Sequence, residues 1–267
     1  MSFKDHFSAH ARDYARYRPT YPGELFAWLS QIAPQHTYAW DCATGNGQAA
    51  VGLAAYFDSV IATDASSDQL RNAEPHPRIV YRIAPAERSG LKTGSIDLIA
   101  VAQALHWLDL PRFFAEANRV MRPAGVLAAW AYKVVRITPE IDRVIGDFYT
   151  RIVGPFWPPG RAIVEAGYAT IDFPFEELNP PRFEMKACWT LSQLVGYLRT
   201  WSATQKYIAA RKTDPLDRLE QVLLPLWRDH RTRTIRWPLS LRVGRKQEHS
   251  FAFARPGESV LRGRSNS

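Results

Sequence analysis

Near-continuous apolar segments alternate with amphipathic ones over the first 133 residues of the chain. Segments of about four to eight residues that are apolar throughout and rich in β-branched or aromatic side chains are typical of buried strands. Such segments lie at residues 37–40, 59–63, 79–83, 95–102 and 126–132. Strands that are apolar on both faces indicate a parallel sheet with helices on both sides, so the sequence predicts a Rossmann-like, doubly wound α/β fold.

Apolar residues at helical spacing fill the gaps between these strands. The predicted helices lie at residues 22–32, 48–57, 66–72 and 110–121. Pro22 suits the first helical turn, and Ser66 suits the N-cap that precedes a short helix. Residues 122–125 combine Pro and Gly in stopping positions and predict a turn before the last strand of this half.

The pattern changes after Lys133, where helical segments dominate. Helices are predicted at residues 139–153, 191–210 and 215–227, and strands at residues 182–189 and 233–243. The proline-rich segment 154–160 predicts a turn without regular structure, because proline lacks the backbone N–H that helices and sheets use. Pro238 predicts an interruption of the closing strand and a place near an edge of the sheet.

These patterns divide the chain into a core and a cover. We expect a single domain over residues 1–246, with a core at 35–133 and a helical cover at 134–230 inserted before the last strands. Residues 247–267 are polar, contain glycine and show no periodicity, so we expect a disordered tail there.

Composition places the chain among globular proteins. Its 267 residues are 46% hydrophobic, which suffices for one large core. No apolar run approaches the roughly 20 residues of a membrane span, and residues 1–13 lack the apolar stretch of a signal peptide, so we expect a cytoplasmic protein without a membrane partner. Cys42 and Cys188 lie far apart and lack metal-ligand spacing, so we expect neither a disulfide nor a metal.

A formal charge of +8 and a pI of about 9.6 raise the question of a nucleic-acid partner. The positive charge is spread along the chain and is densest at residues 228–246, where arginines alternate with Trp237 and apolar residues. That alternation is typical of the solvent face of a strand, and no recognised nucleic-acid motif accompanies it. We therefore do not expect a nucleic-acid partner.

The first predicted strand runs into Asp41 and a tight turn that contains Gly45 and Gly47. Glycines at such a turn let the backbone approach a ligand, and the helix that follows offers unpaired N–H groups. Small residues alternate here at positions 43, 45 and 47, which differs from the G-x-G-x-x-G spacing of dinucleotide-binding sites. Asp41 is placed to accept a hydrogen bond or an ion pair from an amino group of the ligand.

Further candidate residues follow the next three strands, at the edge where open parallel sheets form a ligand crevice. Asp64 lies about 20 residues after the glycine turn, where a carboxylate accepts the hydroxyls of a ribose. Ala86 and Glu87 follow the third strand and suit an adenine ring and its edge. Gln103 and His106 follow the fourth strand. His106 is either a buried structural histidine or a catalytic base, and the sequence leaves both open.

Together these motifs resemble the class I S-adenosylmethionine-dependent methyltransferases of the type 11 group, which includes the trans-aconitate methyltransferase-like enzymes. The matching segments, in order, are residues 41–47, 63–64, 86–87, 95–99, 103–107 and 119–127. The resemblance implies a mostly parallel sheet of seven strands and S-adenosylmethionine as the cofactor. One departure is Ala43, which replaces the family's usual first glycine although alanine disfavours positive φ.

The resemblance also implies contacts for individual residues. Arg18 resembles the arginine that pairs with the cofactor carboxylate, and Gln103 would line the passage from the cofactor to the substrate. The remaining implied cofactor contacts are Asp41, Ala43 and Gly45 at the methionine part, Asp64 at the ribose, and Ala86 and Glu87 at the adenine side.

The implied activity is transfer of a methyl group from S-adenosylmethionine to an O, N or C atom of a small molecule. A sulfonium methyl is strongly electrophilic, so the protein mainly holds the acceptor in line and excludes water, with a general base needed only for a protonated acceptor. The aromatic residues of the cover suit an apolar or planar acceptor. Three alternatives stay open: a cofactor-binding interaction module without catalysis, a nicotinamide-dependent oxidoreductase, which the glycine spacing disfavours, and a nucleic-acid methyltransferase, which the charge motivates.

Overall fold

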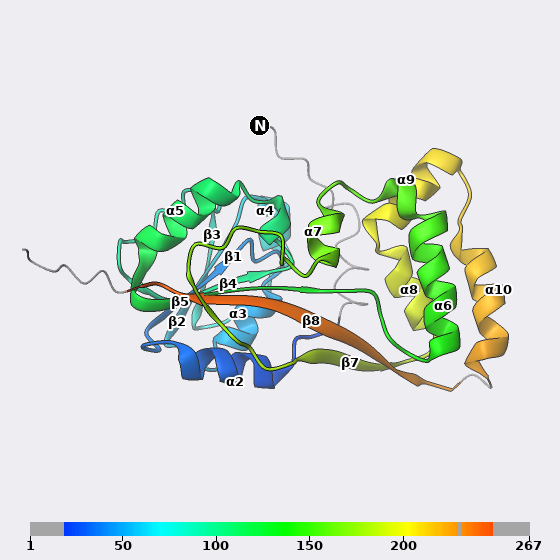
Figure 1. Cartoon of the computed structure of the whole chain (residues 1–267), viewed down its shortest axis with the longest axis horizontal. Helices are drawn as coiled ribbons and strands as arrows, with labels where there is room; N and C mark the ends of the chain where they lie inside the picture. Colours follow the sequence, from blue (N-terminus) through cyan, green and yellow to red (C-terminus); the bar gives the residue numbers. More distant parts are fainter. Residues whose placement is uncertain (1–18, 229–230, 248–267) are drawn as a thin grey trace, which may run out of the picture.

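The computed structural model describes residues 19–228 and 231–247 and shows a sheet-based half beside a helical half (Figure 1). The sheet has eight strands, one more than the seven predicted. The strands are β1 (Tyr38–Cys42), β2 (Ser59–Asp64), β3 (Ile79–Ile83), β4 (Ile96–Ala102), β5 (Met121–Tyr132), β6 (Glu176–Leu178), β7 (Glu184–Trp189) and β8 (Arg233–Arg245). Their order is β3-β2-β1-β4-β5-β8-β6, and β7 pairs with β8 off this path. The predicted doubly wound α/β fold is confirmed.

The central strands are parallel, so their carboxyl ends meet at one edge of the sheet. Asp41 on β1 is in register with Ala62 on β2 and with Ala100 on β4. The pairs β1–β2, β2–β3, β1–β4 and β4–β5 are parallel, whereas β8 runs antiparallel to β5 and β6. After β1 the chain forms β2 and β3 on one side of β1, and it then crosses to the other side of β1 to form β4. Open α/β sheets bind ligands at such a reversal of strand order.

Helices cover both faces of the sheet and form the second half of the molecule. Those beside the sheet are α2 (Gly23–Ile32), α3 (Gln48–Leu53), α4 (Ser67–Arg71) and α5 (Leu110–Val120). Those after β5 are α6 (Pro139–Asp147), α7 (Arg161–Glu165), α8 (Leu191–Arg199), α9 (Ser202–Arg211) and α10 (Leu216–Trp227). Single turns of 3-10 or π geometry lie at Leu105–Trp107, Phe148–Ile152 and Gly154–Phe156. The predicted N-cap is confirmed, because the side chain of Ser66 accepts a hydrogen bond from the N–H of Gln69.

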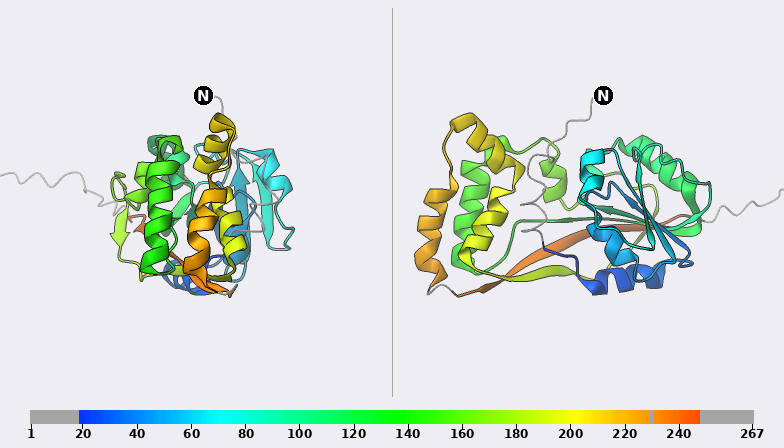
Figure 2. Two further views of the ribbon diagram at one scale, coloured as in Figure 1. Left: turned by 90° about the vertical axis from the view of Figure 1, so that its right-hand side faces the viewer. Right: turned by 180° about the vertical axis from the view of Figure 1, so that it is seen from behind.

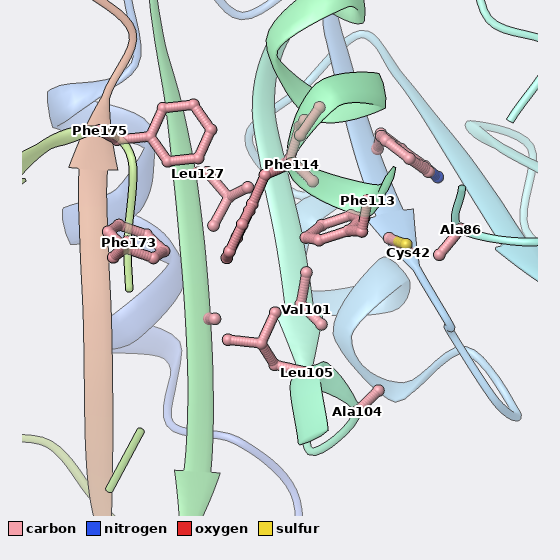
Figure 3. Packing of buried hydrophobic residues seen from close by; sticks show 14 of the residues in the cluster. Cys42, Ala86, Val101, Ala104, Leu105, Phe113, Phe114, Leu127, Phe173 and Phe175 are labelled. Carbon is pink, nitrogen blue, oxygen red and sulfur yellow. The ribbon is translucent and has the colours of Figure 1, made fainter. Parts of the chain in front are cut away.

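Two apolar clusters cover the two faces of the sheet. The cluster on the α5 face, shown in Figure 3, includes Phe113, Phe114, Phe173 and Phe175. On the other face, α2 and α3 pack so closely that a Cβ atom at Gly52 would lie 2.1 Å from the ring of Phe26. Glycine is therefore required at this point of α3, and the close approach holds the helix that follows the glycine turn against the sheet.

A third apolar cluster joins helices of the second half to the far ends of β5, β7 and β8. Figure 2 shows β8 running from the sheet into the helical half. Its centre is aromatic: the ring centroid of Tyr197 on α8 lies 5.9 Å from that of Trp201 and 5.5 Å from that of Trp237 on β8. The long strands β5 and β8 thus extend from the sheet into the helical half. None of the described helices is long and apolar enough to cross a membrane.

The helical half departs from the prediction at three places. The helix predicted over 191–210 is divided into α8 and α9, because Trp201 adopts an extended conformation (φ −65°, ψ 131°) and buries its ring. α6 ends at Asp147 and a π-helical turn follows, where the sequence predicts one helix over 139–153. α7 was not predicted, and segment 154–160 begins with a 3-10 turn rather than irregular structure.

The predicted interruption of the last strand is wrong, since β8 continues through Pro238. Leu239 donates its N–H to the carbonyl of Phe183 on the β7 side, so the proline nitrogen faces the opposite side, where β5 has ended. Proline is therefore compatible with the strand at this point. The turn predicted at 122–125 lies instead in the irregular start of β5, where Ala124 has a φ of 59°.

The predicted division of the chain stays a prediction. β5 ends next to the boundary placed between the core (35–133) and the cover (134–230), and the helices α6 to α10 follow it. Of the tail predicted at 247–267, only Gln247 lies among the described residues.

Candidate active site

The turn after β1 uses the left-handed backbone conformation repeatedly. Ala43 has a φ of 54°, Gly45 of 59° and Gly47 of 88°. A Cβ atom at Gly47 would lie 2.5 Å from the hydroxyl of Tyr81, so glycine is required there for steric as well as conformational reasons. The expectation that alanine avoids this conformation does not hold at Ala43, where the surrounding turn imposes it at a cost of about 1 kcal/mol.

Asp41 is completely buried at the end of β1, directly before this turn. The Thr44 hydroxyl donates a hydrogen bond to Oδ2, whereas Oδ1 has no hydrogen-bond partner among the described residues. Burial raises the pKa of Asp41 to about 7, opposed by the hydrogen bond from Thr44 and by the backbone of Ala50 and reinforced by the negative charge of Asp64. The vacant acceptor on a buried carboxylate favours a ligand that brings a positive charge or a donor.

Asp64 ties the glycine turn to the end of β2. Its Oδ2 accepts the N–H of Gly45 at 2.9 Å, and its Oδ1 accepts the N–H of Ser66 at 2.8 Å. The structure therefore brings Asp41, Gly45 and Asp64 together, as the sequence predicts, and adds a direct bond between two of them.

The loop after β3 reaches the same edge of the sheet. Ala86 is buried and belongs to the same apolar cluster as Cys42 of β1 (Figure 3). Glu87 accepts the N–H of Asp109 at 3.0 Å through Oε1, and Asp109 in turn caps the start of α5 by accepting the N–H of Arg112. Glu87 thus supports the loop after β4, a role that the sequence did not predict, and its contact with an adenine stays a prediction.

Gln103 follows β4 with a φ of 58°, which is uncommon for a residue that is not glycine. Its N–H donates to the carbonyl of Trp130 at 2.8 Å, and its side-chain amide lies 3.5 Å from the carbonyl of Tyr132. Both partners lie on β5, so the strained residue is held at the carboxyl ends of two adjacent strands. Strain of this kind is concentrated at functional sites, where surrounding contacts maintain it.

A pocket lies where Gln103 faces the helical half. Its lining from the sheet-based half consists of Gln103, His106, Trp107, Tyr132 and Lys133. Its lining from the helical half consists of Trp157, Pro158, Arg161, Tyr197, Trp201 and Ser202. Among the described residues that line it, none is an aspartate or a glutamate, so the pocket offers aromatic faces, hydrogen-bond donors and two cations.

Comparisons with known proteins show the family of the chain. Residues 40–129 match a family model described as a methyltransferase domain. A protein of Dictyostelium discoideum that is named as a methyltransferase is 32% identical, over 92% of this chain and 96% of its own length. The chain belongs to the class I S-adenosylmethionine-dependent methyltransferases.

Two further relatives of this methyltransferase extend the likeness. The solved structure of a protein from Anaeromyxobacter dehalogenans, described as a type II methyltransferase, is 43% identical with a TM-score of 0.83 and covers 87% of this chain and 100% of that chain. A Saccharomyces cerevisiae protein named as an S-adenosylmethionine-dependent methyltransferase is 32% identical over 51% of this chain and 48% of its own length. The likeness therefore reaches beyond the residues of the family model, while the trans-aconitate-like subgroup stays a prediction.

Arg161 is the most firmly held cation in the pocket of this methyltransferase. Its guanidinium carbon lies 4.6 Å from the ring centroid of Trp157 and 5.2 Å from that of Tyr149. Its Nε also contacts the hydroxyl of Tyr149 and lies 3.8 Å from a carboxylate oxygen of Glu165. The sequence carries no motif that identifies Arg161, since α7 is a single short helix after a proline-rich segment.

His106 lines the same pocket and contacts a tyrosine through one of its ring nitrogens. Its Nδ1 is 3.2 Å from the hydroxyl of the buried Tyr168. Burial, with a smaller contribution from the charge of Arg161, lowers the pKa of His106 to about 4. The imidazole is therefore neutral at physiological pH.

Two site predictions stay predictions. Arg18, predicted to pair with the cofactor carboxylate, lies outside the described residues. Among the described residues, no group of three or more His, Cys, Asp or Glu side chains is arranged to hold a metal ion.

Proposed function

We propose that the crevice at the carboxyl ends of β1 to β4 binds S-adenosylmethionine and that the adjoining pocket holds a small-molecule methyl acceptor. The observation that carries this proposal is the completely buried Asp41, whose Oδ1 lacks a partner among the described residues beside a glycine turn. S-adenosylmethionine carries an ammonium group, a sulfonium and two ribose hydroxyls. Those groups match a buried carboxylate with a free lone pair and a second carboxylate, Asp64, at the end of the next strand.

Each crevice residue has an assigned contact in this proposal. Asp41 accepts the ammonium group, and Asp64, which also accepts the N–H groups of Gly45 and Ser66, accepts the ribose hydroxyls. The other assigned contacts are Ala43 and Gly45 at the methionine part, Ala86 and Glu87 at the adenine side, Gln103 at the passage to the acceptor and Arg18 at the cofactor carboxylate.

The chemistry divides between the cofactor and the chain. The bound cofactor supplies an electrophilic methyl group. The residues of the pocket orient the acceptor and exclude water, which are the main contributions that such a transfer requires of a protein. Because no carboxylate lines the described pocket, the acceptor presents its own lone pair rather than losing a proton to an aspartate or glutamate.

A small molecule fits the pocket better than a nucleic acid does. The walls are the rings of Trp157, Tyr197 and Trp201, which come from different elements of the helical half. The basic segment at 228–246, which motivated the nucleic-acid alternative, is partly engaged within the fold. There Arg236 lies 2.7 Å from a carboxylate oxygen of Glu184, and Arg242 lies 2.6 Å from one of Glu177.

Two linked measurements test the proposal on the full chain. Isothermal titration with S-adenosylmethionine and S-adenosylhomocysteine is expected to show binding of both, and no binding would overturn the proposal. Incubation with methyl-labelled S-adenosylmethionine and a cell extract, followed by separation by size, is expected to label the small-molecule fraction. Label in the nucleic-acid fraction would favour the nucleic-acid alternative, and binding without label in any fraction would favour the interaction module.

A further inference from the structure

We propose that Tyr168 is a positioning residue that fixes the tautomer of His106, so that Nε2 carries the proton and faces the acceptor as a hydrogen-bond donor. His106 then orients the acceptor and does not remove a proton from it. The identity of what fills the pocket rests on the proposed function, whereas the tautomer itself is a property of the chain.

Tyr168 is held in an unusual place immediately after α7. It is fully buried and has a φ of 64°, a left-handed conformation that is uncommon for a bulky residue. Its N–H donates to the carbonyl of Ile163 at 3.0 Å, and its own carbonyl accepts from Arg242 on β8 at 2.7 Å. The backbone is thus fixed from both sides, which fixes where the phenol hydroxyl lies.

The hydrogen bonds of this hydroxyl determine which nitrogen of His106 is bare. Burial raises the pKa of Tyr168, and a backbone hydrogen bond from Leu105 acts in the opposite direction. Tyr168 is fully buried, and a buried hydroxyl proton needs an acceptor. Among the described residues, Nδ1 of His106 lies within hydrogen-bonding distance of this hydroxyl, at 3.2 Å, and we assign it as the acceptor of the hydroxyl proton. A neutral imidazole that accepts at Nδ1 carries its proton on Nε2.

The surroundings of the ring oppose a second proton. Arg161 on α7 adds positive charge beside the ring, and Lys133 at the end of β5 lines the same pocket. Among the described lining residues no carboxylate stabilises an imidazolium. The ring therefore stays neutral while its Nε2–H, on the far side of the ring from Tyr168, is available to an acceptor oxygen or nitrogen. A general base would need the reverse arrangement, with a bare Nε2.

The tautomer can be read directly by NMR. Full-length protein labelled with ¹⁵N-histidine is compared with and without S-adenosylhomocysteine, and His106→Gln identifies the signals of His106. The wild type is expected to show a protonated Nε2 and a bare Nδ1 for His106 from pH 8 to pH 5. Tyr168→Phe is expected to shift His106 to a mixture of the two tautomers.

Tyr149→Phe is the matched control. It also removes a largely buried tyrosine hydroxyl beside the pocket, but that hydroxyl contacts Glu165 and Arg161 instead of His106. Tyr149→Phe is expected to leave the tautomer of His106 unchanged. If loss of any buried hydroxyl near the pocket were enough to change the tautomer, both variants would show the change.

The results separate this inference from the proposed function. A proton on Nδ1 in the wild type, or a Tyr168→Phe protein with the wild-type tautomer, would overturn the inference even if the cofactor binds. Absence of cofactor binding by calorimetry would overturn the proposed function and leave the tautomer assignment standing. If Tyr168→Phe fails to fold, the wild-type measurement alone decides.

Discussion

The crevice and the pocket differ in the parts of the chain that form them. The crevice consists largely of backbone and short loops at the ends of adjacent strands, as in the bonds from Thr44 to Thr63 and from Gly45 to Asp64. The pocket consists of side chains from separate helices, such as Arg161 layered on Trp157. The crevice is therefore determined mainly by local sequence at the strand ends, whereas the pocket forms only when the helices of the second half pack together. We therefore expect substitutions in the pocket to leave cofactor binding in the crevice unchanged, and substitutions in the crevice to leave the pocket unchanged.

The largest effect is expected at Trp201, at the centre of the helical half. Its buried ring lies 5.6 Å from that of Trp157 and 5.6 Å from that of Tyr149. Trp201→Ala should lower the free energy of unfolding by about 3–5 kcal/mol, because it leaves a large cavity. Urea unfolding gives this value, and calorimetry on the folded fraction should show cofactor affinity within about twofold of wild type. A large loss of cofactor affinity would mean that pocket and crevice are not separable.

Asp41→Asn is the corresponding substitution in the crevice, where we expect the change in cofactor affinity. It removes the buried negative charge but keeps the shape of the side chain, so affinity for S-adenosylmethionine should fall by about 2–4 kcal/mol. Asp58→Asn, at an exposed position in the loop before β2, is the matched control and should bind like the wild type. Equal affinity of the two variants, measured by calorimetry, would remove Asp41 from the site.

The pH dependence of stability follows from the same carboxyl. Its pKa is raised from 3.8 to about 7 in the folded protein, so the stability linked to its protonation is complete below pH 4 and is lost as the pH rises to about 7. Between pH 5 and pH 8 the cofactor-free wild type should lose about 2.5 kcal/mol more stability than Asp41→Asn. Urea unfolding at the two pH values checks this. Parallel pH profiles of the two proteins would contradict the assignment.

The smallest effect is expected at Ala43. Ala43→Gly relieves a left-handed alanine and should raise the free energy of unfolding by about 0.5–1 kcal/mol, with little change in cofactor affinity. Ala49→Gly, within the helix α3, is the control and should destabilise the protein by about 1 kcal/mol. Thermal unfolding of the two variants gives the comparison, and a destabilised Ala43→Gly protein would mean that the turn carries no such strain.

The sheet-based half could be predicted closely from the sequence because its signals are local. β3 occupies the predicted residues 79–83, and Ser66 caps α4 as predicted. The residues at the strand ends, Asp41, Gly45 and Asp64, meet because parallel strands bring their carboxyl ends to one edge. Burial of Asp41 and the bond from Asp109 to Glu87 could not be predicted, since both depend on how separate segments pack together.

The helical half could be predicted only coarsely because its features arise from packing. The spacing at 191–210 suits one helix, yet burial of Trp201 divides it. Neither α7 nor Arg161 has a motif, and the left-handed conformation of Tyr168 contradicts its intrinsic preference. The aromatic lining of the pocket could be expected from the sequence, but its cations and its histidine–tyrosine pair could not.

A crystal structure of the full chain with S-adenosylhomocysteine tests the central claim most directly. The account predicts the ligand across the carboxyl ends of β1 to β4, with its amino group at Asp41, its ribose at Asp64 and its sulfur facing the pocket beside Gln103. A ligand bound elsewhere, or bound in the crevice with its sulfur turned away from that pocket, would contradict the account.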